Sequence, residues 1–176
     1  MSGAASTVTV LALLRSREDQ VSLREIFRHS NWNLHFVETI AKARTLIDEL
    51  SADVVISDSR LPDGRWHDVI CELRRRPVEP PLLVASRLAN EGTWAEVLNQ
   101  GGYEVLAIPF KPREVFRSVS LAWRYWRDQL KAAPSAARSI GYRPSNDDAL
   151  SPFHDVYGTP QNDLVGASAP GPRRRA

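Results

Sequence analysis

The fold of this chain is decided by the stretch Ala52-Asp53-Val54-Val55-Ile56-Ser57-Asp58-Ser59-Arg60-Leu61-Pro62-Asp63-Gly64. Residues 54–56 form a short β-branched run, which is typical of a strand buried on both faces of a parallel sheet. Pro62 and Gly64 break the chain after it, so Asp58 is expected where the strand ends. Ligands and chemistry collect at this end of the strands in open parallel sheets. The next helix should begin only at about Arg65, too far along the chain for Asp58 to cap it directly.

The rest of the chain alternates strand and helix patterns. Apolar runs predict strands at residues 8–14, 32–37, 54–57, 82–85 and 104–108, and a helical pattern follows each of them. Five such strand–helix pairs predict an α/β fold, in which right-handed crossovers build a doubly wound five-stranded parallel sheet. The strand that ends at Asp58 should be central in that sheet.

Capping residues mark the expected helix starts. The first helix should begin after Ser16, the second at Thr39 and the fourth after Asn90, because these side chains can accept hydrogen bonds from free N–H groups of the first turn. Pro112 suits the first turn of a last helix that runs to about Leu130. The apolar face of the first helix is expected to consist of Val21, Ile26 and Phe27.

The amino-acid composition limits the classes of protein to which this chain could belong. With 43% hydrophobic and 25% charged residues, the chain fits a soluble globular protein. A net charge of +2 gives no argument for nucleic acid, although Arg173-Arg174-Arg175 are locally basic. The single cysteine, Cys71, favours a reducing cytoplasm and is expected to be buried or half-buried in a helix. No apolar run is long enough to predict a membrane span.

The composition changes after Lys131. Residues 132–176 hold six of the twelve prolines and four of the nine glycines, with few large aliphatic residues. Such a segment buries too little apolar surface to offset the cost of ordering the chain. We therefore expect a folded domain over residues 1–130 and a disordered Pro/Gly-rich tail over residues 131–176. Phe153, Val156 and Tyr157 are interpreted as isolated apolar residues of that tail.

The motif Asp58-x-x-Leu61-Pro62-Asp63-Gly64 after an apolar strand resembles the phosphoacceptor region of response-regulator receiver domains in two-component signalling. It departs from that family at Arg65-Trp66, where a small, glycine-containing turn is usual. The resemblance extends over about residues 7–130. It implies a flavodoxin-like (βα)5 fold with strand order 2-1-3-4-5. It also implies a cis peptide bond between Ile108 and Pro109, and a signalling module that is not an enzyme.

The resemblance also implies a set of site residues. Asp58 matches the phosphoacceptor, and Ser86 matches the hydroxyl group that contacts the phosphoryl group. Magnesium would be held at Asp58 and Arg60 only if the domain is competent for phosphorylation. Two further parts of the family pattern are missing. Ile108 stands in place of the lysine, and Arg15-Ser16 stand in place of the acidic pair after the first strand.

Neighbouring residues offer few replacements for the missing groups. Glu18 and Asp19 are interpreted as ordinary first-turn acids beside an N-cap, although a small loop shift could bring one of them near Asp58. Lys111 lies beyond Pro109 and is expected in solvent. Arg15 either pairs with Asp58, which would lower the pKa of that carboxyl, or points to solvent.

The resulting hypothesis is an atypical receiver with a degenerate active site that acts through a signalling protein partner or a histidine kinase. Leu121 and Tyr125 lie off the apolar face of the last helix and are candidates for a homodimer contact. One alternative is a functional single-domain receiver that takes phosphate from a histidine kinase or phosphotransfer protein. A flavodoxin-like nucleotide-binding enzyme is disfavoured, because Leu14-Arg15-Ser16-Arg17-Glu18 contains no glycine. No spacing typical of metal ligands joins His29, His35, His67 and His154.

Overall fold

A computed structural model describes residues 7–133 of the chain, and its main feature is a five-stranded parallel sheet in the order β2-β1-β3-β6-β7. These strands are β1 (Thr9–Leu13), β2 (Asn33–Val37), β3 (Val54–Asp58), β6 (Leu82–Ser86) and β7 (Glu104–Ala107). When these five strands are numbered in sequence order, their order in the sheet is 2-1-3-4-5, as the resemblance to receiver domains implies. β3 is central, and three of its residues, Val54, Val55 and Ile56, are fully buried.

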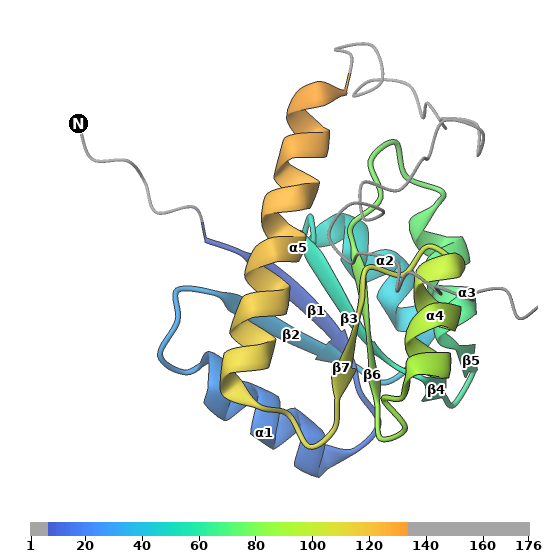
Figure 1. The fold of residues 1–176 in the computed structure, drawn as a ribbon. Helices are drawn as coiled ribbons and strands as arrows, with labels where there is room; N and C mark the ends of the chain where they lie inside the picture. Colours follow the sequence, from blue (N-terminus) through green and yellow to red (C-terminus); the bar gives the residue numbers. More distant parts are fainter. Residues whose placement is uncertain (1–6, 134–176) are drawn as a thin grey trace, which may run out of the picture. The chain divides into compact units, whose positions relative to one another are not determined.

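Helices cover both faces of this sheet (Figure 1). α1 (Arg17–Phe27) and α5 (Pro112–Ala132) pack on one face, where Leu23, Phe27 and Val119 join one apolar core. α2 (Ile40–Glu49), α3 (Trp66–Leu73) and α4 (Glu91–Asn99) pack on the other, where Ile47, Trp66 and Val97 join a second core. The strands β1, β3 and β6 are therefore buried on both faces, as their continuous apolar runs predict, whereas the edge strand β2 is partly exposed.

The predicted helix caps are confirmed. Ser16 accepts a hydrogen bond from the N–H of Asp19 at 3.3 Å, and Asn90 accepts one from Thr93 at 2.9 Å. Thr39 caps α2 in the same way, and Pro112 begins α5. The Ile108–Pro109 peptide bond is cis, as expected.

Several smaller expectations are wrong. Val21 is 53% exposed, and Leu23 takes its place in the core because it faces the sheet. Cys71 is exposed, because it lies on the outer side of α3. α5 continues to Ala132, two residues beyond the expected end of the last helix. The tail expected beyond it, with Phe153, Val156 and Tyr157, falls outside the described residues, apart from its first three positions. Within the described part of the chain, none of the helices combines the length and apolar character that a membrane crossing requires.

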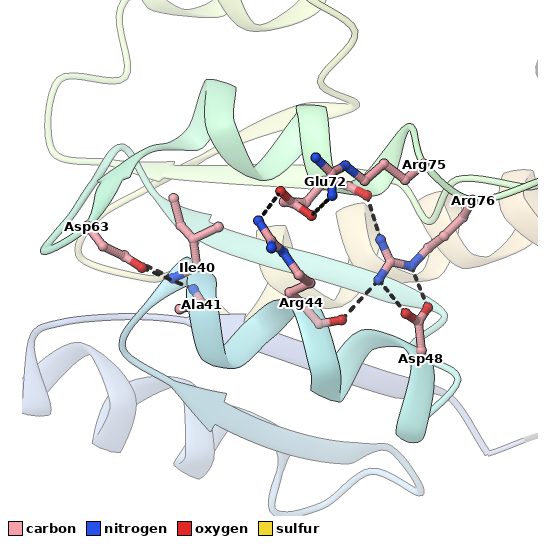
Figure 2. A network of polar contacts seen from close by, with 8 residues as sticks. All are labelled: Ile40, Ala41, Arg44, Asp48, Asp63, Glu72, Arg75 and Arg76. Atoms are coloured by element: carbon pink, nitrogen blue, oxygen red, sulfur yellow. Dashed lines mark hydrogen bonds and ion pairs between the residues drawn. The ribbon is translucent and has the colours of Figure 1, made fainter.

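A two-stranded hairpin, which the sequence pattern does not predict, follows β3. It pairs β4 (Arg60–Leu61) with β5 (Gly64–Arg65) and places Asp63 at its tip. The Asp63 carboxylate accepts hydrogen bonds from the N–H groups of Ile40 at 2.9 Å and Ala41 at 3.0 Å, at the start of α2 (Figure 2). Desolvation raises the pKa of Asp63, but these hydrogen bonds outweigh it and leave the pKa lowered. Asp63 is thus a second cap for α2, supplied from a distant part of the chain.

α2 and α3 are joined by a network of ion pairs (Figure 2). Arg44 Nη2 lies 2.7 Å from Oε1 of the buried Glu72, and Arg76 Nε lies 2.7 Å from Asp48 Oδ1. The guanidinium of Arg76 also donates to the backbone carbonyls of Arg44 and Glu72. Arg75 Nη1 approaches Glu72 Oε2 at 3.6 Å. The charges of Arg44, Arg75 and Arg76 are therefore compensated within the domain.

The capping role of Asp63 predicts a pH-dependent loss of stability on substitution. Asp63→Ala should lower the free energy of unfolding by about 1 kcal/mol at neutral pH, as for other lost helix caps. Because the folded-state pKa is lowered, this stabilisation is present above the ordinary carboxyl pKa and is lost as pH falls through the folded-state pKa. Urea unfolding of both proteins at neutral and acidic pH measures the difference.

Asp63→Asn serves as the matched control, because its amide keeps one acceptor oxygen for the α2 amides. It should therefore lose less stability than Asp63→Ala. Equal losses in the two variants at every pH would contradict the capping role.

Candidate functional site

A cavity of about 220 Å³ opens at the carboxyl edge of the sheet, where β3 and β6 end side by side. Its wall comes from the loop after β1, the end of β3, the loop after β6 and the residue after β7. Two carboxylates, three arginines and three hydroxyl groups line it: Asp19, Asp58, Arg15, Arg60, Arg87, Ser16, Ser59 and Ser86. The parallel register brings these groups together, since Asp58 lies opposite Ala85 and Ser86 follows directly.

Asp58 is the last residue of β3 and is about half buried. Its Oδ2 accepts a hydrogen bond from the backbone N–H of Arg15 at 2.9 Å. Desolvation raises the pKa of Asp58, and this exceeds the lowering by the Arg15 N–H. The charge of Asp19 raises the pKa further, whereas the charges of Arg15 and Arg87 lower it by smaller amounts. Of the two alternatives for Arg15, the structure shows an exposed side chain, and the residue contacts Asp58 through its backbone N–H.

Asp19 belongs to the same cavity. It is 6% exposed, and its Oδ2 lies 2.8 Å from Nη2 of Arg87. The ion pair joins the first turn of α1 to the loop after β6. The interpretation of Asp19 as an ordinary first-turn acid is therefore wrong, whereas Glu18 is exposed as expected. Sequence reasoning missed Arg87, although its position directly after Ser86 is a signal that could have found it.

The other candidates take different positions. Ser86 is 6% exposed, lines the cavity and accepts a hydrogen bond from the N–H of Leu88 at 3.1 Å. Ile108 contributes an aliphatic wall at the position where the resemblance implies a lysine. Lys111 is exposed at the N-cap of α5 and does not line the cavity. Arg60 is exposed on the rim.

The charges in the cavity fit a magnesium ion poorly. Magnesium prefers oxygen ligands and is usually held by one or two carboxylates together with water and phosphate oxygens. Here three arginines face two carboxylates, and Asp19 is committed to Arg87. In the described part of the chain, no group of three His, Cys, Asp or Glu side chains is placed to hold a metal ion. Loading the cavity with a divalent cation would require the Arg87–Asp19 pair to open.

The remaining apolar candidates lie away from the cavity. Leu121 is 41% exposed and Tyr125 is 38% exposed, both on α5. The Tyr125 ring also contacts Tyr103, with ring centroids 5.6 Å apart. A homodimer contact through these residues stays a prediction.

The raised pKa of Asp58 gives a prediction for Asp58→Asn. A raised folded-state pKa means that ionisation of this carboxyl costs folding free energy, and the cost is complete once pH exceeds that pKa. Asp58→Asn should therefore be more stable than the wild type at neutral pH, by less than about 1 kcal/mol because solvent screens a half-buried charge. The difference should disappear below the ordinary carboxyl pKa of about 3.9.

Urea unfolding at several pH values measures this difference, with Asp128→Asn as a control at an exposed carboxylate of α5. A destabilised Asp58→Asn at neutral pH would show that the Arg15 hydrogen bond outweighs the desolvation of Asp58.

Comparison with known proteins agrees with this architecture. A family model described as the response regulator receiver domain matches residues 17–120. The response regulator protein PilR of Pseudomonas aeruginosa is 22% identical over 131 residues, which are 72% of this chain and 29% of that protein. The chain thus spans less than a third of the length of this curated relative.

Solved structures with the same fold are also receiver domains. The signal receiver domain of a LuxO repressor protein from Vibrio parahaemolyticus has a TM-score of 0.66 at 17% identity, covering 73% of this chain and 98% of its own. The chemotaxis response regulator CheY4 of Vibrio cholerae has a TM-score of 0.60 at 17% identity, covering 66% and 99%. The beryllofluoride-activated NtrC4 receiver domain dimer has a TM-score of 0.61 at 22% identity, covering 67% and 98%. With the family match over residues 17–120, the chain belongs to the response-regulator receiver domain family, the signalling modules of two-component systems.

Proposed function

We propose that this receiver domain acts through contacts with a signalling protein partner and does not depend on phosphorylation of Asp58. The observation that carries the proposal is the ion pair between Arg87 and Asp19 inside the cavity. In this ion pair Asp19, the second carboxylate of the cavity, is bound to an arginine of the protein itself. The pair also joins two segments that flank Asp58. The domain then holds one arrangement of these loops without a phosphoryl group.

The surroundings of Asp58 support the same proposal. Phosphoryl transfer requires positive charge, placed in advance, where negative charge develops. Ile108 supplies none at the position of the family lysine, and Oδ2 of Asp58 already accepts the Arg15 N–H. In this cavity, one carboxylate oxygen of Asp58 therefore already accepts a hydrogen bond, and the surrounding charges are unfavourable for magnesium.

A functional, phosphorylated receiver is the second candidate. It is favoured by the position of Asp58 at the end of the central strand and by the presence of Ser86 in the same cavity. In that case a histidine kinase or phosphotransfer protein would supply the phosphoryl group, and magnesium would displace Arg87 from Asp19.

The two candidates differ in their response to magnesium and a phosphodonor. We expect the full chain to show no saturable change in tryptophan fluorescence with magnesium, acetyl phosphate or beryllofluoride, and no phosphoryl adduct by intact mass. Asp58→Ala should behave as the wild type in these titrations and remain folded.

A magnesium-dependent change with acetyl phosphate that is lost in Asp58→Ala would contradict the proposal and establish the functional receiver. A known magnesium-dependent receiver, titrated in parallel, confirms that the phosphodonors are active.

The role of Arg87 gives a separate prediction. Arg87→Ala removes one positive charge and frees the Asp19 carboxylate, so magnesium binding should become saturable in this variant, whereas the wild type should show none. Arg60→Ala is the matched control, because Arg60 lines the same cavity and has no ion pair in the described part of the chain. Isothermal titration calorimetry measures both affinities. Equal gains in the two variants would show that the release of Asp19 has no effect.

A further inference from the structure

The cavity at the carboxyl edge of the sheet holds more positive than negative side chains. Three arginines line it, against the carboxylates of Asp19 and Asp58. Arg87 already compensates the charge of Asp19 at 2.8 Å. The guanidinium groups of Arg15 and Arg60 are exposed, and neither forms a hydrogen bond or an ion pair with another group of residues 7–133. The excess of positive charge in the cavity therefore favours an anion over a cation.

The polar groups of the cavity are suited to an oxyanion. Arginine presents a planar fork of N–H donors that matches the oxygens of a carboxylate or a phosphate group. The hydroxyl groups of Ser16, Ser59 and Ser86 line the same cavity. Those of Ser16 and Ser86 already accept backbone N–H groups, so each can still donate its own proton to a ligand. Guanidinium and hydroxyl donors thus surround one small volume.

One wall of the same cavity is aliphatic. It consists of Ala85, Leu88 and Ile108, and the side chain of Leu88 is 75% exposed. Where the family resemblance implies a lysine ammonium, Ile108 offers an apolar surface that an inorganic anion leaves uncovered. Sites for small molecules combine such apolar walls with a few polar groups that orient the ligand. The volume of about 220 Å³ limits the ligand to a small molecule.

We propose that this cavity binds a small organic anion, which carries an oxyanion head on a short aliphatic chain. The head would contact the arginines and hydroxyl groups, and the chain would cover Ile108 and Leu88. Binding requires neither a metal ion nor a covalent bond to Asp58. The proposal deepens the proposed function and rests on it, because it requires that Asp58 is not used as a phosphoryl acceptor.

The ligand would also connect segments that are far apart in the sequence. Arg15 follows β1, Arg60 belongs to the hairpin after β3, and Arg87 follows β6. A ligand that contacts all three holds these segments in one arrangement and stabilises the folded state. Occupancy of the cavity therefore controls the surface that the domain presents at this edge of the sheet.

Calorimetric titration of the full chain tests the proposal. No tryptophan is among the residues that line the cavity, so heat is a better signal than fluorescence. The probes are propyl phosphate and butyrate, each compared with its head group alone, inorganic phosphate and acetate. All titrations contain EDTA and are made at constant ionic strength. The two pairs distinguish a phosphate ester from a carboxylate as the preferred ligand.

We expect propyl phosphate or butyrate to bind at one site per chain and more tightly than its head group alone. The double variant Arg15→Gln with Arg60→Gln should weaken this binding by at least about tenfold, because it removes both exposed guanidinium groups. The double variant Lys42→Gln with Arg117→Gln makes the same charge change at exposed positions outside the cavity and should leave binding unchanged.

Two further variants separate the aliphatic wall from the charge. Ile108→Thr keeps the β-branched shape and the net charge, and it should remove most of the preference for the aliphatic chain. Asp58→Asn removes a negative charge from the cavity and should tighten binding of the anion, whereas it would abolish capture of a phosphoryl group by Asp58. Circular dichroism confirms that each variant is folded.

The proposal is overturned if neither organic anion binds more tightly than its head group, since the cavity would then hold an adventitious ion only. Equal losses in the two double variants would also overturn it, as would binding that requires magnesium and is lost in Asp58→Asn. The two proposals fail separately. A phosphoryl adduct on Asp58 overturns the proposed function, whereas failure of the organic anions to bind, without such an adduct, overturns this inference alone.

Discussion

The sheet of this domain is parallel and must be covered on both faces, and the rest of the structure depends on this constraint. Parallel strands require crossover helices, and those helices can pack only against strands that are apolar on both sides. The central strand, Val54–Asp58, meets the requirement with Val54, Val55 and Ile56 fully buried. Burial of each such side chain contributes about 1.5–3 kcal/mol. Because parallel strands all end at the same edge of the sheet, the polar residues at the ends of β3 and β6 meet there in one cavity.

The cavity at the carboxyl edge of the sheet is rich in charged side chains. Three arginines and two carboxylates share a small volume, and the buried Asp19 is compensated by Arg87. A buried carboxylate without such a partner would be costly, so the pair stabilises the position of both loops. In a magnesium-dependent site the metal would take that compensating role. An arginine of the protein itself supplies the charge here, which is why we favour a domain that presents a fixed surface to a partner.

Ion pairs connect two helices on one side of the sheet. On the side of α2 and α3, Arg44 forms an ion pair with Glu72, and Arg76 forms one with Asp48. These contacts fix one helix to the next. On the other side, Leu121 and Tyr125 of α5 are exposed. The LPDG segment likewise has a structural use, because Asp63 caps α2.

The strand order was implied by the family resemblance, whereas the sequence pattern by itself determined the five-stranded parallel sheet, the helix caps at Ser16, Thr39 and Asn90, and the position of Asp58 at the end of the central strand. These features depend on local patterns, such as apolar periodicity and capping residues, that neighbours in the chain reveal. Only the tertiary structure decided which groups surround Asp58. The Arg87–Asp19 pair joins residues 68 positions apart, and the bond from the Arg15 N–H to Asp58 spans 43. The exposure of Val21 and Cys71 was decided in the same way, because the rotation of a helix against a sheet depends on how both surfaces pack.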